Sequence, residues 1–168
     1  MAEELSGEVD GSGLRVGVIV ARFNETVTSR LLEGARQALE RHGVRPDAVT
    51  IVHVPGSPEL PQAAQRMARS GRWDSLVALG CVIRGETAHF DLVAAEAARG
   101  IAQVAREHGI AIGFGVLTTE DTAQAMARSG GELGNRGSDA VEAALRMASV
   151  NRQLDGAAKP PPSTKDRP

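Results

Sequence analysis

Aromatic residues are scarce in this sequence: three phenylalanines, one tryptophan and no tyrosine make up only 2% of its 168 residues. Hydrophobic residues still account for 42% of the chain, so valine, leucine, isoleucine and alanine have to build the core. Because such a core needs no aromatic ring for packing, Phe23 and Phe114 become candidates for holding a flat ligand ring. Plain packing is the alternative for each, but both fall at expected strand ends, which favours a pocket.

Several other features are missing, and each absence excludes a class of protein. The single cysteine, Cys81, excludes an internal disulfide, and the acidic amino terminus has no apolar signal core, so we expect a cytoplasmic protein. No stretch is long enough to span a bilayer. A net charge of −2 with mixed signs favours a small-molecule substrate over nucleic acid or a membrane. The four histidines and the cysteine lack metal-ligand spacing, so we expect no metal.

Four apolar runs, each followed by a helical pattern, organise the chain. We expect strands at residues 14–20, 48–54, 75–83 and 110–117. Strands that alternate with helices form parallel sheets with right-handed crossovers. The sequence therefore predicts an α/β fold, a flavodoxin-like three-layer sandwich with a four-stranded parallel sheet flanked by helices.

Helix boundaries follow from capping residues. Asn24 is the expected cap of the first helix, and Ser57 of the second. The third helix is expected at residues 89–108. Thr118 with Asp121 resembles a capping box for a short helix ending near residues 130–131. A last helix is expected to end near residue 153.

The chain reads as one domain at residues 13–153. Residues 1–12 are polar, and we expect them to be flexible unless they pair with a neighbour. Residues 154–168 are rich in proline and lack an apolar face, so we expect a disordered tail.

The chemistry is concentrated in the stretch 78–91, at the carboxyl edge of the third strand, where open α/β sheets place their ligands. Gly85, Glu86 and Thr87 open a helix, so their backbone N–H groups form a candidate anion site. An ordinary strand-to-helix turn capped by Thr87 is the alternative. His89 lies in the first helical turn, where the helix dipole favours a neutral imidazole suited to proton transfer, although a surface histidine fits as well.

Two further residues have simpler interpretations. Cys81 lies inside an apolar strand without an adjacent base, so we interpret it as a packed wall residue rather than a nucleophile. Arg128 closes a helix, where a cation complements the helix dipole. No Gly-rich dinucleotide or triphosphate motif follows any strand, so an anion site has to be built in another way.

Taken together, these residues and their separations resemble the lumazine synthase family over about residues 13–153. The resemblance is carried by the following residues, in order: Phe23-Asn24; Pro55-Gly56-Ser57 with Glu59; Gly80-Cys81-Val82-Ile83-Arg84-Gly85 with Thr87, His89, Phe90 and Asp91; Phe114-Gly115-Val116-Leu117-Thr118; Arg128; and Gly134-Asn135 with Gly137.

The resemblance implies a transferase of the penultimate step of riboflavin biosynthesis. The reaction condenses 5-amino-6-(D-ribitylamino)uracil with 3,4-dihydroxy-2-butanone 4-phosphate to 6,7-dimethyl-8-ribityllumazine, and it releases phosphate and water. No cofactor and no metal are implied. The implied assembly is a homopentamer or a pentamer-based icosahedral shell, with riboflavin synthase as a further partner.

The resemblance also implies a role for each site residue. His89 would move protons. The pyrimidine ring and ribityl chain would be held by Phe23, with its neighbour Asn24, and by Ser57, Glu59, Val82 and Ile83. The phosphate would be held by Gly85, Glu86, Thr87 and Arg128. Phe114 and Arg128 would come from the adjacent subunit.

Two positions depart from the family pattern. Arg136 replaces the usual lysine, which keeps a phosphate-facing charge but makes proton transfer there doubtful. Pro58 replaces a bulky apolar residue and stiffens the helix start. These departures leave open an alternative function, a flavin- or lumazine-binding or shell-forming paralogue with little synthase activity.

Overall fold

A parallel sheet with strand order β2-β1-β3-β4 forms the middle layer of the molecule, and its strands are Val16–Ala21 (β1), Val49–Val54 (β2), Ser75–Ile83 (β3) and Ala111–Thr119 (β4). The computed structural model describes residues 1–156. The predicted tail beyond residue 156 lies outside the described residues. The fold prediction, a four-stranded parallel sheet flanked by helices, is confirmed.

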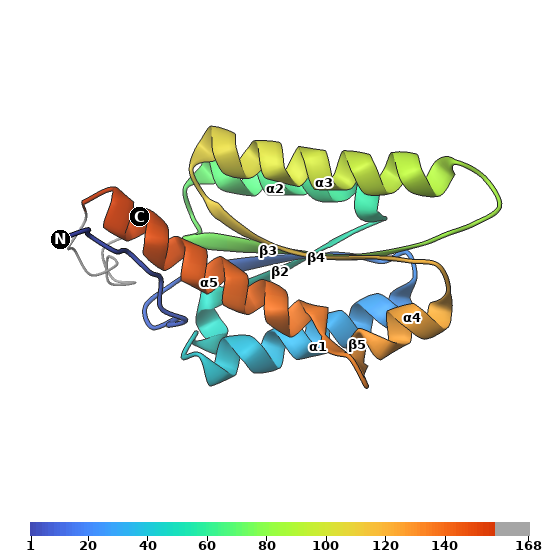
Figure 1. The fold of residues 1–168 in the computed structure, drawn as a ribbon, viewed down its shortest axis with the longest axis horizontal. Coiled ribbons are helices and arrows are strands. Elements are labelled where there is room, and N and C mark those ends of the chain that lie inside the picture. The colour runs from blue at the N-terminus through green and yellow to red at the C-terminus, as the bar shows by residue number, and fades with distance from the viewer. Residues whose placement is uncertain (157–168) are drawn as a thin grey trace.

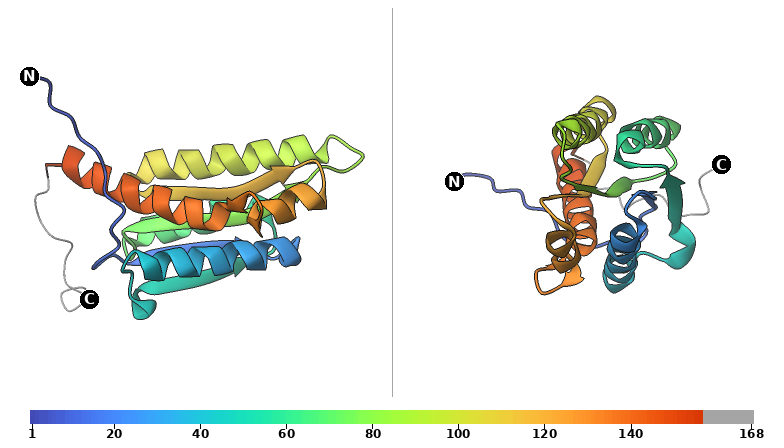
Figure 2. Two further views of the ribbon diagram at one scale, coloured as in Figure 1. Left: turned by 60° about the horizontal axis from the view of Figure 1, so that its bottom comes forward. Right: turned by 90° about the vertical axis from the view of Figure 1, so that its right-hand side faces the viewer.

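Two layers of helices cover the sheet (Figure 1). One face carries α2 (Leu60–Ser70) and α3 (His89–His108), while the other carries α1 (Glu25–Arg41), α4 (Thr122–Ala127) and α5 (Arg136–Leu154). Figure 2 shows the same layers from the end of the sheet. Each face has its own aliphatic core. Ile19, Leu76 and Ile101 pack on the α2/α3 side, and Val18, Leu79 and Leu145 pack on the α1/α5 side.

β3 is one of the two interior strands of the sheet, together with β1. Its sequence SLVALGCVI is buried at every position except the last, because helices cover both faces. β3 pairs with β1 on one side and with β4 on the other. The expected bounds of β3 and α3 are confirmed, and β1 and β2 end within one residue of their expected positions.

The region after β4 differs from the prediction. Thr118 does not cap a helix, because β4 continues through Thr119. Asp121 is the cap of α4, and its carboxylate accepts a hydrogen bond of 2.8 Å from the backbone N–H of Gln124. The helix ends at Ala127 rather than near residues 130–131. A short antiparallel hairpin, β5 (Ser129–Gly131) with β6 (Gly134–Asn135), then leads into α5.

The amino-terminal segment lies along α5. Arg146 donates a hydrogen bond of 2.9 Å to the carbonyl of Gly7, and Gln153 donates one of 2.7 Å to the carbonyl of Ser6. A β-carbon on Gly7 would stand 2.1 Å from the carbonyl oxygen of Arg146, so only glycine allows this close approach. These contacts place residues 6–8 beside the carboxyl-terminal half of α5.

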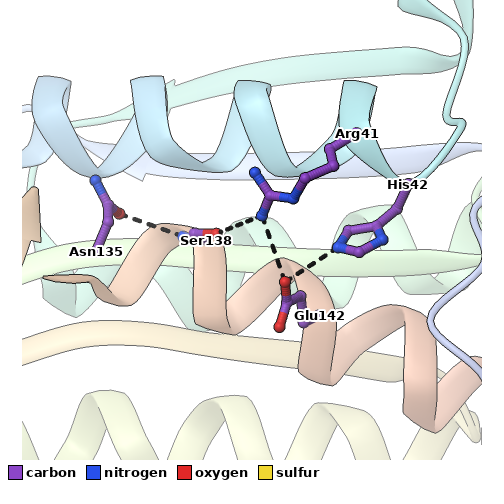
Figure 3. A network of polar contacts seen from close by, with 5 residues as sticks. All are labelled: Arg41, His42, Asn135, Ser138 and Glu142. Atoms are coloured by element: carbon purple, nitrogen blue, oxygen red, sulfur yellow. Dashed lines mark hydrogen bonds and ion pairs between the residues drawn. The ribbon is translucent and has the colours of Figure 1, made fainter.

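A polar network joins the end of α1 to the beginning of α5 (Figure 3). One oxygen of Glu142 accepts a hydrogen bond of 3.0 Å from Nε2 of His42, and it lies 3.4 Å from Nη2 of Arg41. Arg41 also donates to the hydroxyl of Ser138 at 3.2 Å. Asn135 caps α5 through the N–H groups of Gly137 and Ser138. This network fixes one end of α5 against α1.

Candidate functional site

A cavity of about 480 Å³ lies at the carboxyl ends of β1, β2 and β3. Because all four strands are parallel, these ends meet at one rim of the sheet. The cavity is lined from four segments: Phe23 after β1; Pro55 to Glu59 after β2; Cys81, Val82, Ile83, Gly85 and Thr87 at the end of β3; and His89, Phe90 and Val93 at the start of α3. Much of this lining is apolar, which suits a flat organic ring.

The turn after β1 presents Phe23 to the cavity. The side chain of Phe23 is 71% exposed, which is unusual for so large an apolar group. Asn24 follows in the left-handed region, with φ 60° and ψ 47°. Its side chain makes no helix-capping hydrogen bond, so the expected cap is wrong in that respect. It donates instead to the backbone carbonyl of Cys81 at 2.9 Å, and Asn24 is not part of the cavity wall.

The segment after β2 supplies two polar side chains, Ser57 and Glu59, to the cavity wall. The carboxylate of Glu59 accepts a hydrogen bond of 2.9 Å from the backbone N–H of Gly56. Ser57 is buried, and Pro58 lies within a short 3₁₀ helix, η2 (Ser57–Glu59), before α2 begins at Leu60. Ser57 therefore does not cap α2, contrary to the prediction. Its hydroxyl lies against the backbone of β3 at Gly80.

Cys81 forms part of the wall. The thiol is buried, and burial raises its pKa to about 11. At neutral pH the group is therefore a thiol rather than a thiolate, and it contributes apolar surface. This agrees with its interpretation as a packing residue.

The loop between β3 and α3 is exposed from Arg84 to His89. Within it, the hydroxyl of Thr87 accepts a hydrogen bond of 3.3 Å from the backbone N–H of His89. Gly85, Thr87 and His89 line the cavity, whereas Glu86 does not. The loop thus offers backbone N–H groups and an imidazole at the amino terminus of α3, with the carboxylate of Glu86 outside the wall.

Besides Asn24 and Glu86, three predicted site residues do not line this cavity: Phe114, Arg128 and Arg136. Phe114 is in the middle of β4, where it pairs with Ala78, and not at the strand's end as expected. Its side chain is 45% exposed on an edge strand. Arg128 donates to the carbonyl of Gln124 at 3.0 Å, and Arg136 forms an ion pair of 2.8 Å with Asp139.

The hairpin β5–β6 brings the two arginines together. The backbone N–H of Arg136 donates to the carbonyl of Arg128 at 2.9 Å. The backbones of the two arginines therefore lie side by side at the two ends of the hairpin, on the α1/α5 side of the sheet. Their positions eight residues apart in the sequence gave no hint of this pairing.

Some wall residues were missed by sequence reasoning. Phe90 and Val93 enter the cavity from the first turns of α3, and Phe90 is nearly buried. The scarcity of aromatic residues was a usable signal for Phe90, since it applied to this ring as much as to Phe23. Arg84 was named in the resemblance but was given no role: it does not line the cavity, and its guanidinium lies over the Phe90 ring at 4.4 Å from the ring centroid.

Neither a metal cluster nor a membrane span is found within residues 1–156. No group of three or more His, Cys, Asp or Glu side chains in this range is arranged to hold a metal ion. In the same part of the chain, every helix is too short or too polar to cross a membrane.

Comparison with known proteins gives a consistent result. The sequence profile of the 6,7-dimethyl-8-ribityllumazine synthase family matches residues 13–152. A protein from Chlorobaculum tepidum named 6,7-dimethyl-8-ribityllumazine synthase is 45% identical over 152 residues, which is 90% of this chain and 98% of that protein. The family match includes every segment that lines the cavity.

Proposed function

The chain belongs to the 6,7-dimethyl-8-ribityllumazine synthase family, and from this premise we propose that the rim cavity is one half of its active site. As a member of the family it is a transferase of riboflavin biosynthesis. It condenses 5-amino-6-(D-ribitylamino)uracil with 3,4-dihydroxy-2-butanone 4-phosphate to 6,7-dimethyl-8-ribityllumazine, with release of phosphate and water. Each substrate has its own part of the cavity.

The aminoribityluracil occupies the apolar part of the cavity. Phe23 is exposed there and offers a ring face for stacking on the pyrimidine. Ser57 and Glu59 supply polar contacts, and Val82 and Ile83 supply backbone groups and apolar surface at the end of β3. Asn24 acts through its hydrogen bond to Cys81, which fixes the turn that carries Phe23.

The butanone phosphate binds at the loop before α3. Gly85, Glu86 and Thr87 place backbone N–H groups and one hydroxyl at a helix amino terminus, where anions are stabilised. His89 lies next to them and moves protons during imine formation and phosphate loss. Bringing two reactants together in the right orientation removes much of the barrier to an amine–carbonyl condensation.

One observation carries the proposal that a second copy completes the site. Among the residues of the described chain that line the cavity, none is a lysine or an arginine. A phosphate dianion needs cationic donors on more than one side. Arg128 and Arg136 flank the hairpin with their backbones joined by a hydrogen bond, and Phe114 is exposed on the edge strand β4, all outside the chain's own cavity. We assign these three residues to the site of the adjacent subunit in a homopentamer.

Mixed oligomers test this assignment. Arg128→Ala and Phe23→Asp are each expected to abolish most activity, by removing the phosphate cation and the ring platform respectively. In a cyclic interface of the head-to-tail kind, random 1:1 mixing of the two variants leaves about one quarter of the sites with both halves intact. Lumazine formation should therefore reappear on co-refolding. Activity that stays at the level of the separate variants would place both residues in one subunit's site.

Saturation kinetics test the reaction itself. Lumazine appearance, followed by absorbance and fluorescence, should saturate in both substrates above the uncatalysed background. Absence of turnover in intact oligomers would favour a binding or shell-forming paralogue. A cytoplasmic location, assembly of pentamers into an icosahedral shell and an encounter with riboflavin synthase are further parts of this proposal. Sizing of the purified protein, alone and with riboflavin synthase, tests the last two.

A further inference from the structure

The loop between β3 and α3 has few contacts of its own, although the proposed function requires it to hold a phosphate. Its residues are exposed, and a single hydrogen bond involving a side chain, from His89 N–H to Thr87, lies within it. A β-carbon on Gly85 would meet nothing within 4 Å. The position of the loop therefore depends on what holds its two ends.

Arg84 joins these two ends. Its backbone N–H donates to the carbonyl of Thr119 at 2.8 Å, which extends the β3–β4 pairing. Its Nη2 lies 3.5 Å from the carboxylate of Asp91 in the first turn of α3. Its guanidinium also lies over the ring of Phe90. One side chain thus spans the loop from the residue before it to the helix after it.

The same guanidinium reaches a third element. Nε of Arg84 lies 2.9 Å from the carboxylate of Glu120, at the end of β4. The backbone of Glu120 is held in turn, because its N–H donates to the side-chain oxygen of Gln124 at 2.9 Å, next to the capped start of α4. Arg84 therefore forms an ion pair with Glu120, a residue whose backbone is held at the rim by the side chain of Gln124.

We propose that Arg84 is a positioning residue for phosphate binding: by bridging Glu120 and Asp91 over the Phe90 ring, it holds in place the loop 85–88, of which Gly85 and Thr87 line the cavity. This inference rests on the proposed role of that loop. Arg84 acts through the loop and Phe90, since its own guanidinium is turned to two carboxylates and does not line the cavity. Its planar, forked head is suited to serving two carboxylates and a ring at once.

The competing explanation is a direct contact between Arg84 and the phosphate. A substitution at Glu120 distinguishes this explanation from the positioning role. If Arg84 only positions the loop, Glu120→Gln weakens phosphate binding as Arg84→Gln does, because either change breaks the bridge. If Arg84 binds phosphate itself, Glu120→Gln frees the guanidinium and removes a repelling charge, so binding is unchanged or tighter. Arg84→Lys also distinguishes the two explanations. Lysine keeps the positive charge, but it cannot bridge the two carboxylates and stack on the Phe90 ring at the same time.

The experiment measures steady-state kinetics and inhibition by inorganic phosphate on intact oligomers. For Arg84→Gln we expect about a tenfold rise in the KM of the butanone phosphate and in the phosphate inhibition constant, with the KM of the aminoribityluracil unchanged. Glu120→Gln should shift the same two constants in the same direction. The double variant should be no worse than Arg84→Gln alone, because both act through one bridge.

The matched control is Arg45→Gln. Arg45 also forms an exposed ion pair, with Asp47 at 2.6 Å, but it precedes β2 and lies at the opposite rim. It should leave all constants unchanged. Phosphate constants unchanged in Arg84→Gln, or tightened in Glu120→Gln, overturn the inference; if Arg84→Gln does not assemble, Glu120→Gln and Asp91→Asn decide. Thr87→Ala tests the loop itself. If the phosphate inhibition constant is unchanged in both Arg84→Gln and Thr87→Ala, the result contradicts the proposed role of the loop in phosphate binding rather than the positioning role of Arg84.

Discussion

The side-chain amide of Asn24 donates a hydrogen bond of 2.9 Å to the backbone carbonyl of Cys81, and this bond ties the turn after β1 to the end of β3. Asn24 is also the one residue other than glycine with a positive φ among residues 1–156. Asparagine tolerates the left-handed region better than most residues do. The residue thus satisfies two demands at once, the tight turn and the cross-strand bond that places Phe23 at the cavity.

Two substitutions separate these demands. Asn24→Gly keeps the backbone conformation and loses the bond, so we expect a loss of about 1 kcal/mol in unfolding free energy. Asn24→Ala loses the bond and also incurs the left-handed strain, for a loss of about 2–3 kcal/mol. Both should raise the KM of the aminoribityluracil. Urea unfolding at one fixed protein concentration measures the loss in unfolding free energy. Equal stability of Asn24→Gly and Asn24→Ala would contradict the proposed cost of the left-handed conformation for alanine.

Much of the fold was predictable because the strands and helices carry strong local patterns. The continuous apolar run of β3 and the helical spacing of α3 gave their bounds correctly. The hairpin β5–β6 was missed because strands of three and two residues are too short to show alternation. The predicted carboxyl end of β4 was two residues too early, because its last two residues, Thr118 and Thr119, are polar. Phe114 lies in the middle of β4 under either set of bounds, so its expected position at the strand's end did not follow from the bounds.

The site was predictable only in part, for a different reason. Residues that follow parallel strands meet at one rim of the sheet, whatever the exact packing of the helices. Phe23, Ser57 and Thr87 were therefore expected to lie close together, and all three line the same cavity. Contacts made by long side chains depend on the rotation of a helix about its axis, which sequence spacing does not give. The stacking of Arg84 on Phe90 and its ion pair with Asp91, both on α3, are of this kind.

Gly80 leaves room for Ser57, and a methyl group there should disturb the site. A β-carbon on Gly80 would stand 2.6 Å from the hydroxyl oxygen of Ser57 and 3.1 Å from a methyl carbon of Leu60. We expect Gly80→Ala to lower the unfolding free energy by about 1–3 kcal/mol, as overpacking does, and to raise the KM of the aminoribityluracil. Adding Ser57→Ala removes the nearer clash. The double variant should therefore recover part of the stability, and no recovery would show that Leu60 sets the limit.

The contact between His42 and Glu142 should make stability depend on acid pH. The hydrogen bond from His42, aided by Arg41, holds the pKa of the Glu142 carboxyl below its usual value of 4.5. A lowered folded-state pKa means that the contribution is fully present above the unfolded pKa and is lost as pH falls through the folded one. Glu142→Gln should thus lower the melting temperature at pH 7, with a difference from wild type that shrinks below about pH 4.

The matched control for that measurement is Glu96→Gln. Glu96 pairs with Arg99 on the exposed face of α3, so the pair links no separate elements, and surface pairs of this kind contribute little. Its melting temperature should follow wild type at every pH. A Glu142→Gln difference that stays constant from pH 7 to about pH 3 would mean that packing, not ionisation, accounts for the loss.

His89 is proposed to move protons in a reaction whose barrier is lowered mainly by positioning, so its removal should slow the enzyme without stopping it. General acid–base groups commonly contribute about 10²–10⁴-fold, and the proposed site holds both reactants in place without His89, so we expect His89→Ala to lower kcat by about 10–100-fold. KM values should change little, since the imidazole is exposed at the cavity's edge and the loop N–H groups remain. His53→Ala, which removes an exposed histidine from the edge strand β2, is the control. Assembled His89→Ala with wild-type kcat would remove His89 from the chemistry and leave positioning by the loop and the neighbouring subunit as the whole of catalysis.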